Sequence, residues 1–162
     1  MSETLPVIDP AQFRTVLGHF CSGIAVITAM SAGTPVGMTC QSFTSVSLDP
    51  PLVLFCATKT SASWAGIREA GHFCANVLGA DQEELSRVFS SKAEDKFAGT
   101  GWHAGASGAP VLDGVLATID CTITTIHDGG DHDIVVGRVL ELNGDSGGPL
   151  LFFRGGYGRL GL

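Results

Sequence analysis

Most apolar residues of this chain occur in short runs typical of β-strands. The runs are rich in β-branched and aromatic side chains and are separated by Gly, Pro, Asp and Ser, which is a strand pattern rather than a helical one. In residues 115–124 apolar and polar side chains alternate, so this strand is expected to have one largely hydrated face. The expected strands are residues 24–30, 36–40, 43–48, 52–57, 73–78, 115–124, 134–142 and 150–154.

Helical spacing of apolar residues is confined to short segments. Asp9 and Pro10 form a cap and first-turn signal, after which apolar side chains recur at helical spacing up to residue 20. A second short helix is expected to start after Ser61 or Ser63 and to end at Gly71. The chain therefore begins with one amphipathic helix and has another between two strands.

The region from residue 81 to residue 114 predicts a third helix followed by a connection. Asp81 and Glu84 have the spacing of a capping box before Leu85, Val88 and Phe89. Residues 91–114 have weak periodicity and much Gly, Ala and Ser, so we expect a long surface connection anchored by a tryptophan at position 102.

These elements predict a mainly β protein, an antiparallel barrel with a few short helices. Strands and helices do not alternate regularly, and no G-x-G-x-x-G sequence follows a strand, so a Rossmann site for a dinucleotide is not expected. No repeat or linker divides the 162 residues, and 44% of them are hydrophobic, which is enough for one core. We expect a single domain spanning residues 1–162.

Charge and hydropathy exclude several kinds of partner. The formal net charge is −7 and Lys and Arg are not clustered, whereas a nucleic-acid binder needs a basic face. No apolar run reaches the ~18 residues that a membrane span requires, and no basic segment precedes an apolar one at the N-terminus. A cytoplasmic protein without nucleic-acid or membrane partners is expected.

The residues that could bind a metal do not form a spaced ligand set. The five cysteines are scattered without a C-x-x-C pair, and we expect them to be reduced and structural. Residues 127–133 are rich in His and Asp, but a hydrated hairpin tip explains them equally well. No metal site is expected.

Three other segments have the composition of a cofactor site. Residues 37–45 place a glycine and hydroxyl groups at a strand end, which suits the acceptors of a flavin, although spacing alone favours the polar face of an ordinary strand. Residues 56–63 combine hydroxyl groups, Lys59 and a helix start, as in a phosphate pocket or in simple serine capping. Residues 152–157 bring aromatic rings, Arg154 and glycines together, either for a dinucleotide or as a buried strand end.

Together and in this order, the segments resemble the short-chain flavin reductase family, the reductase components of two-component flavin-dependent monooxygenases. The matching stretches are S-G-I-A-V-I-T (22–28), G-M-T-x-x-S-F (37–43), S-V-S-L-D-P-P-L-V-L (45–54), F-C-A-N-V-L (73–78), K-F (96–97), G-D-H (130–132), P-L-L (149–151) and G-Y (156–157). Residues 40–43 and 127–132 are most similar to the reductases of actinobacterial steroid-degrading monooxygenases. The resemblance covers nearly the whole chain from Phe13 onward.

This resemblance implies a fold, cofactors and partners. The fold is a split β-barrel of the FMN-binding, Greek-key type, usually a homodimer with the flavin near the subunit interface. The cofactors are FMN or FAD, with NADH or NADPH as hydride donor. The partner is a flavin-dependent monooxygenase component that receives the reduced flavin.

The resemblance also implies site residues. Flavin contacts would fall on Gly37, Met38, Thr39, Cys40, Gln41, Ser42, Cys56, Ala57, Thr58, Ser61, Ala62, Ser63 and Phe89, and nicotinamide contacts on His132, Phe152, Phe153, Arg154 and Gly155.

The implied activity is that of an NAD(P)H:flavin oxidoreductase. Hydride transfer between stacked cofactors requires position and electrostatics rather than a nucleophile. Backbone N–H groups of residues 39–42 would stabilise the reduced flavin, and His132 is expected to act in catalysis by orienting the nicotinamide, not as a proton donor. The alternative is a flavin-binding electron carrier or storage protein without reductase activity, against which the G-D-H motif argues. A metal-binding or non-catalytic interaction barrel is the third alternative.

Overall fold

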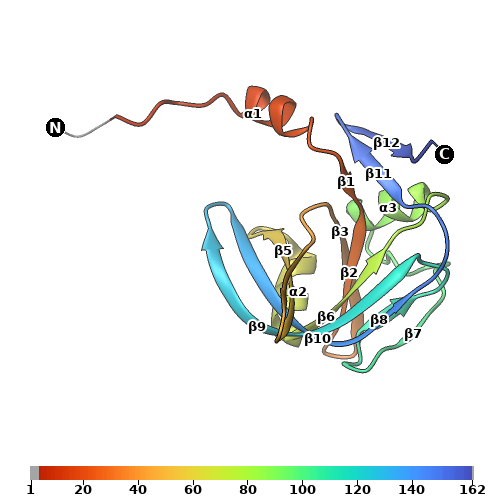
Figure 1. Cartoon of the computed structure of the whole chain (residues 1–162). Coiled ribbons are helices and arrows are strands. Elements are labelled where there is room, and N and C mark those ends of the chain that lie inside the picture. The colour runs from red at the N-terminus through yellow and green to blue at the C-terminus, as the bar shows by residue number, and fades with distance from the viewer. Residues whose placement is uncertain (1–3, 162) are drawn as a thin grey trace.

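The computed structural model describes residues 4–161, which form a mainly β structure with three short helices (Figure 1). The helices are α1 (Pro10–Leu17), α2 (Ala62–Ala70) and α3 (Glu83–Ser90). The strands are β1 (Ser22–Gly23), β2 (Ala25–Ser31), β3 (Thr34–Cys40), β4 (Thr44–Leu48), β5 (Pro51–Thr58), β6 (His72–Val77), β7 (Trp102–Ala104), β8 (Pro110–Leu112), β9 (Ala117–Gly129), β10 (His132–Gly144), β11 (Leu150–Phe153) and β12 (Gly156–Arg159).

The strands form three antiparallel sheets. The largest has the order β3-β2-β6-β9-β10-β5-β4, the second is β1-β11-β12, and β7 pairs with β8. The mainly β class is therefore confirmed. Within residues 4–161 the edge strands β3 and β4 do not pair with each other, so the seven strands do not make a closed hydrogen-bonded barrel.

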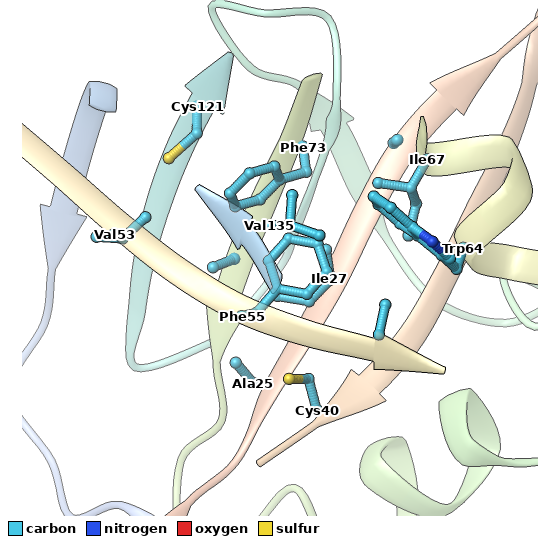
Figure 2. Close-up of a cluster of buried hydrophobic side chains, with 13 residues drawn as sticks. Ala25, Ile27, Cys40, Val53, Phe55, Trp64, Ile67, Phe73, Cys121 and Val135 are labelled. Atoms are coloured by element: carbon cyan, nitrogen blue, oxygen red, sulfur yellow. The ribbon is translucent and has the colours of Figure 1, made fainter. Parts of the chain in front are cut away.

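The main core packs α2 against the seven-stranded sheet. The Phe55 ring meets the rings of Phe73 and Trp64 edge-on, with centroid distances of 4.9 and 5.9 Å, and Figure 2 shows Val135 and Ile27 pointing into the same cluster. Trp64 Nε1 also donates a hydrogen bond of 2.9 Å to a carboxylate oxygen of Asp133, which satisfies two buried polar groups. The start of α2 is thereby fixed relative to β5 and β10.

The caps predicted for the first two helices are confirmed. Asp9 accepts a hydrogen bond from the Gln12 N–H, and Ser61 accepts one from the Trp64 N–H. Gly71 ends α2 in the left-handed conformation, with φ of 74°. No helix within residues 4–161 has the length and apolar character needed to cross a membrane.

The capping box predicted for α3 is wrong. The helix begins at Glu83, and the flanking Gln82 makes no side-chain cap. Asp81 is instead drawn to Arg159 on β12, 3.1 Å away, while the Gln82 side chain accepts the Gly79 N–H. Asp81 therefore lies one residue before the capping position, which Gln82 occupies.

The region expected to be a surface connection contains the β7–β8 hairpin and contributes to the core. Leu112 is buried and its N–H donates to the side-chain oxygen of Asn76, 2.8 Å away. The hydrated face expected for residues 115–124 is also wrong at Asp120, which is only 3% exposed because Ser107 donates to its carboxylate through both N–H and hydroxyl. Both expectations, a surface connection and a hydrated strand face, were wrong for the same reason. Polar groups of Leu112 and Asp120 lose contact with water but gain hydrogen bonds from residues elsewhere in the chain.

Ser42 connects the end of β3 to β5 although these strands are not neighbours in the sheet. Its hydroxyl accepts the Cys56 N–H at 2.9 Å and donates to the Cys56 carbonyl at 3.1 Å. The Ser42 side chain therefore makes the two main-chain hydrogen bonds to Cys56 that a neighbouring strand would otherwise make.

We expect Ser42→Ala to lower the free energy of unfolding by about 0.5–1.5 kcal/mol, since the partner groups are close enough to water to be rehydrated in part. Urea denaturation measures this, with Ser45→Ala on exposed β4 as the control. An unchanged denaturation midpoint for Ser42→Ala would show that the bridge does not stabilise the fold.

Candidate functional site

Two adjoining cavities lie along the free edge of β3. The first, of about 440 Å³, is lined by Ile24, Met38, Thr39, Cys40, Gln41, Ser42, Cys56, Thr58, Ser86, Ser90, His132, Phe152 and Tyr157. The second, of about 1110 Å³, is lined by residues 34–39, 58, 60–63 and 89–97. Both include Met38, Thr39, Thr58 and Ser90, so they are parts of one continuous groove.

Helix α3 forms one wall of the groove and is fixed to β3. The Thr39 hydroxyl donates to the Ser86 carbonyl at 2.7 Å. A Cβ atom at Gly37 would lie only 2.7 Å from the Phe89 ring, so glycine allows the close packing of α3 on β3. The Ser86 hydroxyl in turn lies 2.9 Å from the hydroxyl of Tyr157, which brings β12 to the cavity.

His132 enters the first cavity from the turn between β9 and β10. Its Nε2 lies 3.2 Å from the Thr58 hydroxyl, and its Nδ1 lies 2.7 Å from a carboxylate oxygen of Asp131. The strand register places His132 opposite Thr58. The imidazole is therefore held between β5 and its own turn.

Lys92 and Lys96 line the second cavity, whereas Lys59 does not, and Lys96 is hydrogen-bonded to the cavity wall. Lys96 Nζ donates to the carbonyls of Gly37 and Phe89 and to the Ser63 hydroxyl, at 3.2, 3.1 and 3.3 Å. Partial burial lowers the pKa of Lys96 from its ordinary value. Lys59, which the sequence placed in a phosphate pocket, pairs instead with Asp128 and does not line the second cavity.

Burial raises the pKa of three thiols, of which only Cys40 lines the groove. Burial raises the pKa of Cys40, which lines the first cavity, although the Ser42 hydroxyl at 3.1 Å acts in the opposite direction. Burial also raises the pKa of Cys74 and of Cys121 to about 12. All five cysteines are unpaired, as expected.

The structure brings most of the expected site residues together. Those that line one or both cavities are Gly37, Met38, Thr39, Cys40, Gln41, Ser42, Cys56, Thr58, Ser61, Ala62, Ser63, Phe89, His132 and Phe152. Ala57 faces the core and is fully buried. Phe153, Arg154 and Gly155 line neither cavity, because they form the β11–β12 turn, where Arg154 contacts His19 at 2.7 Å.

Several wall residues were not expected from the sequence. Ser86 and Ser90 share one face of α3 with Phe89, as the spacings of three and four residues imply, and that periodicity is a signal that could have identified them. Lys96 belongs to a stretch that carries the resemblance, yet no site role had been attached to it, and Tyr157 had been considered only as part of the candidate dinucleotide segment 152–157.

The His- and Asp-rich turn of residues 127–133 does not gather a ligand set. Within residues 4–161, no three His, Cys, Asp or Glu side chains lie together as a metal site would require. Asp128 and Asp131 instead contact Lys59 and His132 respectively.

Comparison with known proteins gives a consistent result over almost the full chain. The chain is 53% identical over 151 residues to the Flavin-dependent monooxygenase, reductase subunit HsaB, of Rhodococcus jostii, covering 93% of this chain and 77% of that protein. Its fold matches a homologue of nitrilotriacetate monooxygenase component B from Mycobacterium thermoresistibile, with a TM-score of 0.91, 49% identity and coverage of 93% and 86%. It also matches the Streptomyces globisporus NADH:FAD oxidoreductase SgcE6 in complex with NAD and FAD fragments, with a TM-score of 0.90, 36% identity and coverage of 97% and 98%.

The family model called Flavin reductase like domain matches residues 17–161. This range includes β3, α2, α3 and the β9–β10 turn, from which the groove is built. The resemblance seen in the sequence is confirmed, and the chain belongs to the flavin reductase family.

Proposed function

We propose that this flavin reductase oxidises NADH or NADPH, reduces FMN or FAD by hydride transfer, and passes the reduced flavin to a partner monooxygenase. The observation that carries the proposal is the division of the groove into two parts. The first cavity has no Asp, Glu, Lys or Arg in its wall, whereas the second is lined by Lys92, Glu94, Asp95 and Lys96 and by the N-terminus of α2. An uncharged compartment suits hydride transfer, and a lysine beside a helix N-terminus suits a phosphate.

The wall of the first cavity fits a flavin ring. Gln41 and Ser42 follow the last residue of β3 and line the first cavity. Their main-chain N–H groups, of which that of Ser42 also contacts the Cys40 thiol, suit the carbonyl and nitrogen acceptors of the ring's pyrimidine edge. A flavin bound here supplies the hydride-accepting chemistry, and these N–H groups stabilise the negative charge that reduction brings.

The second cavity fits the flavin phosphate. Lys96 Nζ has three neutral oxygen partners and, within the described residues, no carboxylate in direct contact, although Glu94 and Asp95 line the same cavity. Lys96 Nζ lies against Ser63 in the first turn of α2, where the helix dipole also favours an anion. An anionic phosphate at this position would neutralise the lysine at low cost.

His132 and Phe152 are the nicotinamide contacts that the geometry supports. Both line the first cavity, and the related NADH:FAD oxidoreductase of Streptomyces globisporus is named for that donor. NADH is therefore the donor to test first. Phe153, Arg154 and Gly155 stay predictions, because the described cavities do not include them.

The reductase is favoured over a flavin carrier or storage protein. The Rhodococcus jostii relative is a monooxygenase reductase subunit, and the family model describes reductases. A monooxygenase component is accordingly the proposed acceptor of the reduced flavin. A cytoplasmic location and the absence of nucleic-acid partners stay predictions.

We further propose a homodimer of split β-barrels of the Greek-key type. The approach of β3 to β5 at Ser42 supports the barrel. On α1 the apolar side chains of Phe13, Val16 and Leu17 are 52–57% exposed, and Figure 1 shows this helix and the arm before it lying away from the seven-stranded sheet. A self-complementary interface between two copies would bury this face.

Purified protein should oxidise NADH through many turnovers when FMN or FAD and oxygen are present. His132→Ala should raise the KM for NADH while flavin affinity stays nearly unchanged, since its proposed contact is with the nicotinamide. Stopped-flow flavin bleaching at several NADH concentrations, with a melting curve as folding control, measures both effects. A single stoichiometric oxidation would indicate a carrier, and normal bleaching kinetics in folded His132→Ala would refute the assignment of His132.

Lys96→Met should weaken FMN binding about threefold to thirtyfold, because the variant loses a charge-assisted contact with the phosphate. Riboflavin lacks the phosphate and is the matched control, so its affinity should change much less. Fluorescence titration measures both ligands. Equal losses for FMN and riboflavin would show that Lys96 acts only by supporting the cavity wall.

Light scattering should give a mass twice the 16.7 kDa of the chain. Phe13→Glu, which places a charge on the apolar face of α1, should shift the protein toward monomer, whereas Gln12→Glu on the same helix should not. A stable wild-type monomer in the presence of flavin would contradict the proposed dimer.

A further inference from the structure

The turn between β9 and β10 contains a carboxylate that the proposed mechanism does not yet use. Asp131 is exposed, and its oxygen contacts Nδ1 of the neighbouring His132 at 2.7 Å. The hydrogen bond from His132 lowers the pKa of Asp131 from its ordinary value, so the carboxylate is ionised at neutral pH.

An ionised carboxylate only accepts hydrogen bonds, which determines the proton position on the imidazole. Nδ1 of His132 must be the donor to Asp131, so in the neutral ring Nε2 carries no proton. Nε2 then accepts the hydrogen bond of 3.2 Å from the Thr58 hydroxyl, on the side of the ring that meets the cavity. In the neutral ring, the His132 nitrogen at the first cavity is thus a hydrogen-bond acceptor rather than a donor.

The main chain holds the turn in place. The Lys59 N–H donates to the Asp131 carbonyl at 3.0 Å, and the Lys59 ammonium pairs with Asp128 at the other side of the turn. Because Lys59 follows β5 directly, the turn is tied to the segment that leads into α2. The main chain of Asp131, from which its carboxylate extends, is therefore held close to His132.

We propose that Asp131 is a positioning residue, which keeps His132 in the Nδ1–H tautomer so that Nε2 accepts an N–H of the nicotinamide carboxamide. This inference rests on the proposed role of His132 in nicotinamide binding. The Thr58 hydroxyl can rotate away from Nε2, so the contact of 3.2 Å leaves the acceptor available to a ligand. Asp131 itself lines neither cavity and acts only through the imidazole.

The test is Asp131→Asn in the full chain, which preserves the shape of the side chain but removes its obligatory acceptor character. An amide can accept from Nδ1–H or donate to a bare Nδ1, so both tautomers of His132 become accessible. Asp145→Asn is the control, because it removes one negative charge at an exposed position that lines neither cavity. Long-range ¹⁵N NMR of the imidazoles, assigned with His132→Ala, shows the tautomer directly, and stopped-flow reduction gives the NADH dependence.

We expect wild type and Asp145→Asn to show only the Nδ1–H form of neutral His132, and Asp131→Asn to show a mixture. In Asp131→Asn the KM for NADH should rise about threefold to tenfold, because one oriented hydrogen bond to the nicotinamide is lost. The kcat and the flavin affinity should change much less. A wild-type tautomer and wild-type KM in Asp131→Asn would overturn the inference.

The two possible failures are distinguishable. If His132→Ala leaves the KM for NADH unchanged, the proposed role of His132 fails and the inference fails with it. If His132→Ala raises the KM but Asp131→Asn does not, the proposed function stands and only the positioning role of Asp131 is refuted.

Discussion

Strand β3 has a strand partner on one side only, and side chains rather than another strand hold its other edge. An unpaired strand edge presents N–H and C=O groups that must be covered or hydrated. Here Lys96 covers the Gly37 carbonyl, the Thr39 hydroxyl attaches α3, and Ser42 bridges to Cys56 on β5. The groove is the space left between these attachments. Site and fold therefore depend on the same few polar contacts.

A consequence is that the polar side chains of the wall are already hydrogen-bonded to protein. The hydroxyls of Thr39 and Ser42 have protein partners, so they orient the wall before they can contact a ligand. Other polar groups of the wall include main-chain N–H past the end of β3, the His132 imidazole and the Lys96 ammonium group. Such a wall is preorganised, which suits a reaction in which the protein supplies geometry rather than a reacting group.

Local signals in the sequence predicted local structure, and they failed where distant residues intervene. Asp9 and Ser61 cap helices because their partners lie three residues away. Asp81 does not cap α3, because the helix begins at Glu83 and Gln82 takes the capping position, while the Asp81 carboxylate contacts Arg159 at the other end of the described chain.

The same distinction separates the site residues that the sequence could supply from those it could not. The stretch from Gly37 to Ser42 was assigned to the site through the family resemblance, since its spacing alone favoured an ordinary strand face, and the strand end brings these consecutive residues to the two cavities. The sequence could not show that Lys96 rather than Lys59 contacts Ser63 in the second cavity. Lys59 pairs with Asp128 instead, and only the sheet register brings those two residues together. Spacing within one element is readable from sequence, whereas pairing between elements requires the fold.

The distribution of charge in the groove separates affinity from reactivity. The protein carries a net charge of −7, so an anionic cofactor gains no long-range attraction from the molecule as a whole. Under the proposed assignment its phosphate is held locally, by Lys96 and the start of α2 at the end away from His132. The first cavity has no ammonium or guanidinium in its wall, so a negative charge on a ring bound there would be stabilised only by dipoles. The proposed assignment therefore separates the lysine that would hold the phosphate from the dipoles that would stabilise the reduced ring.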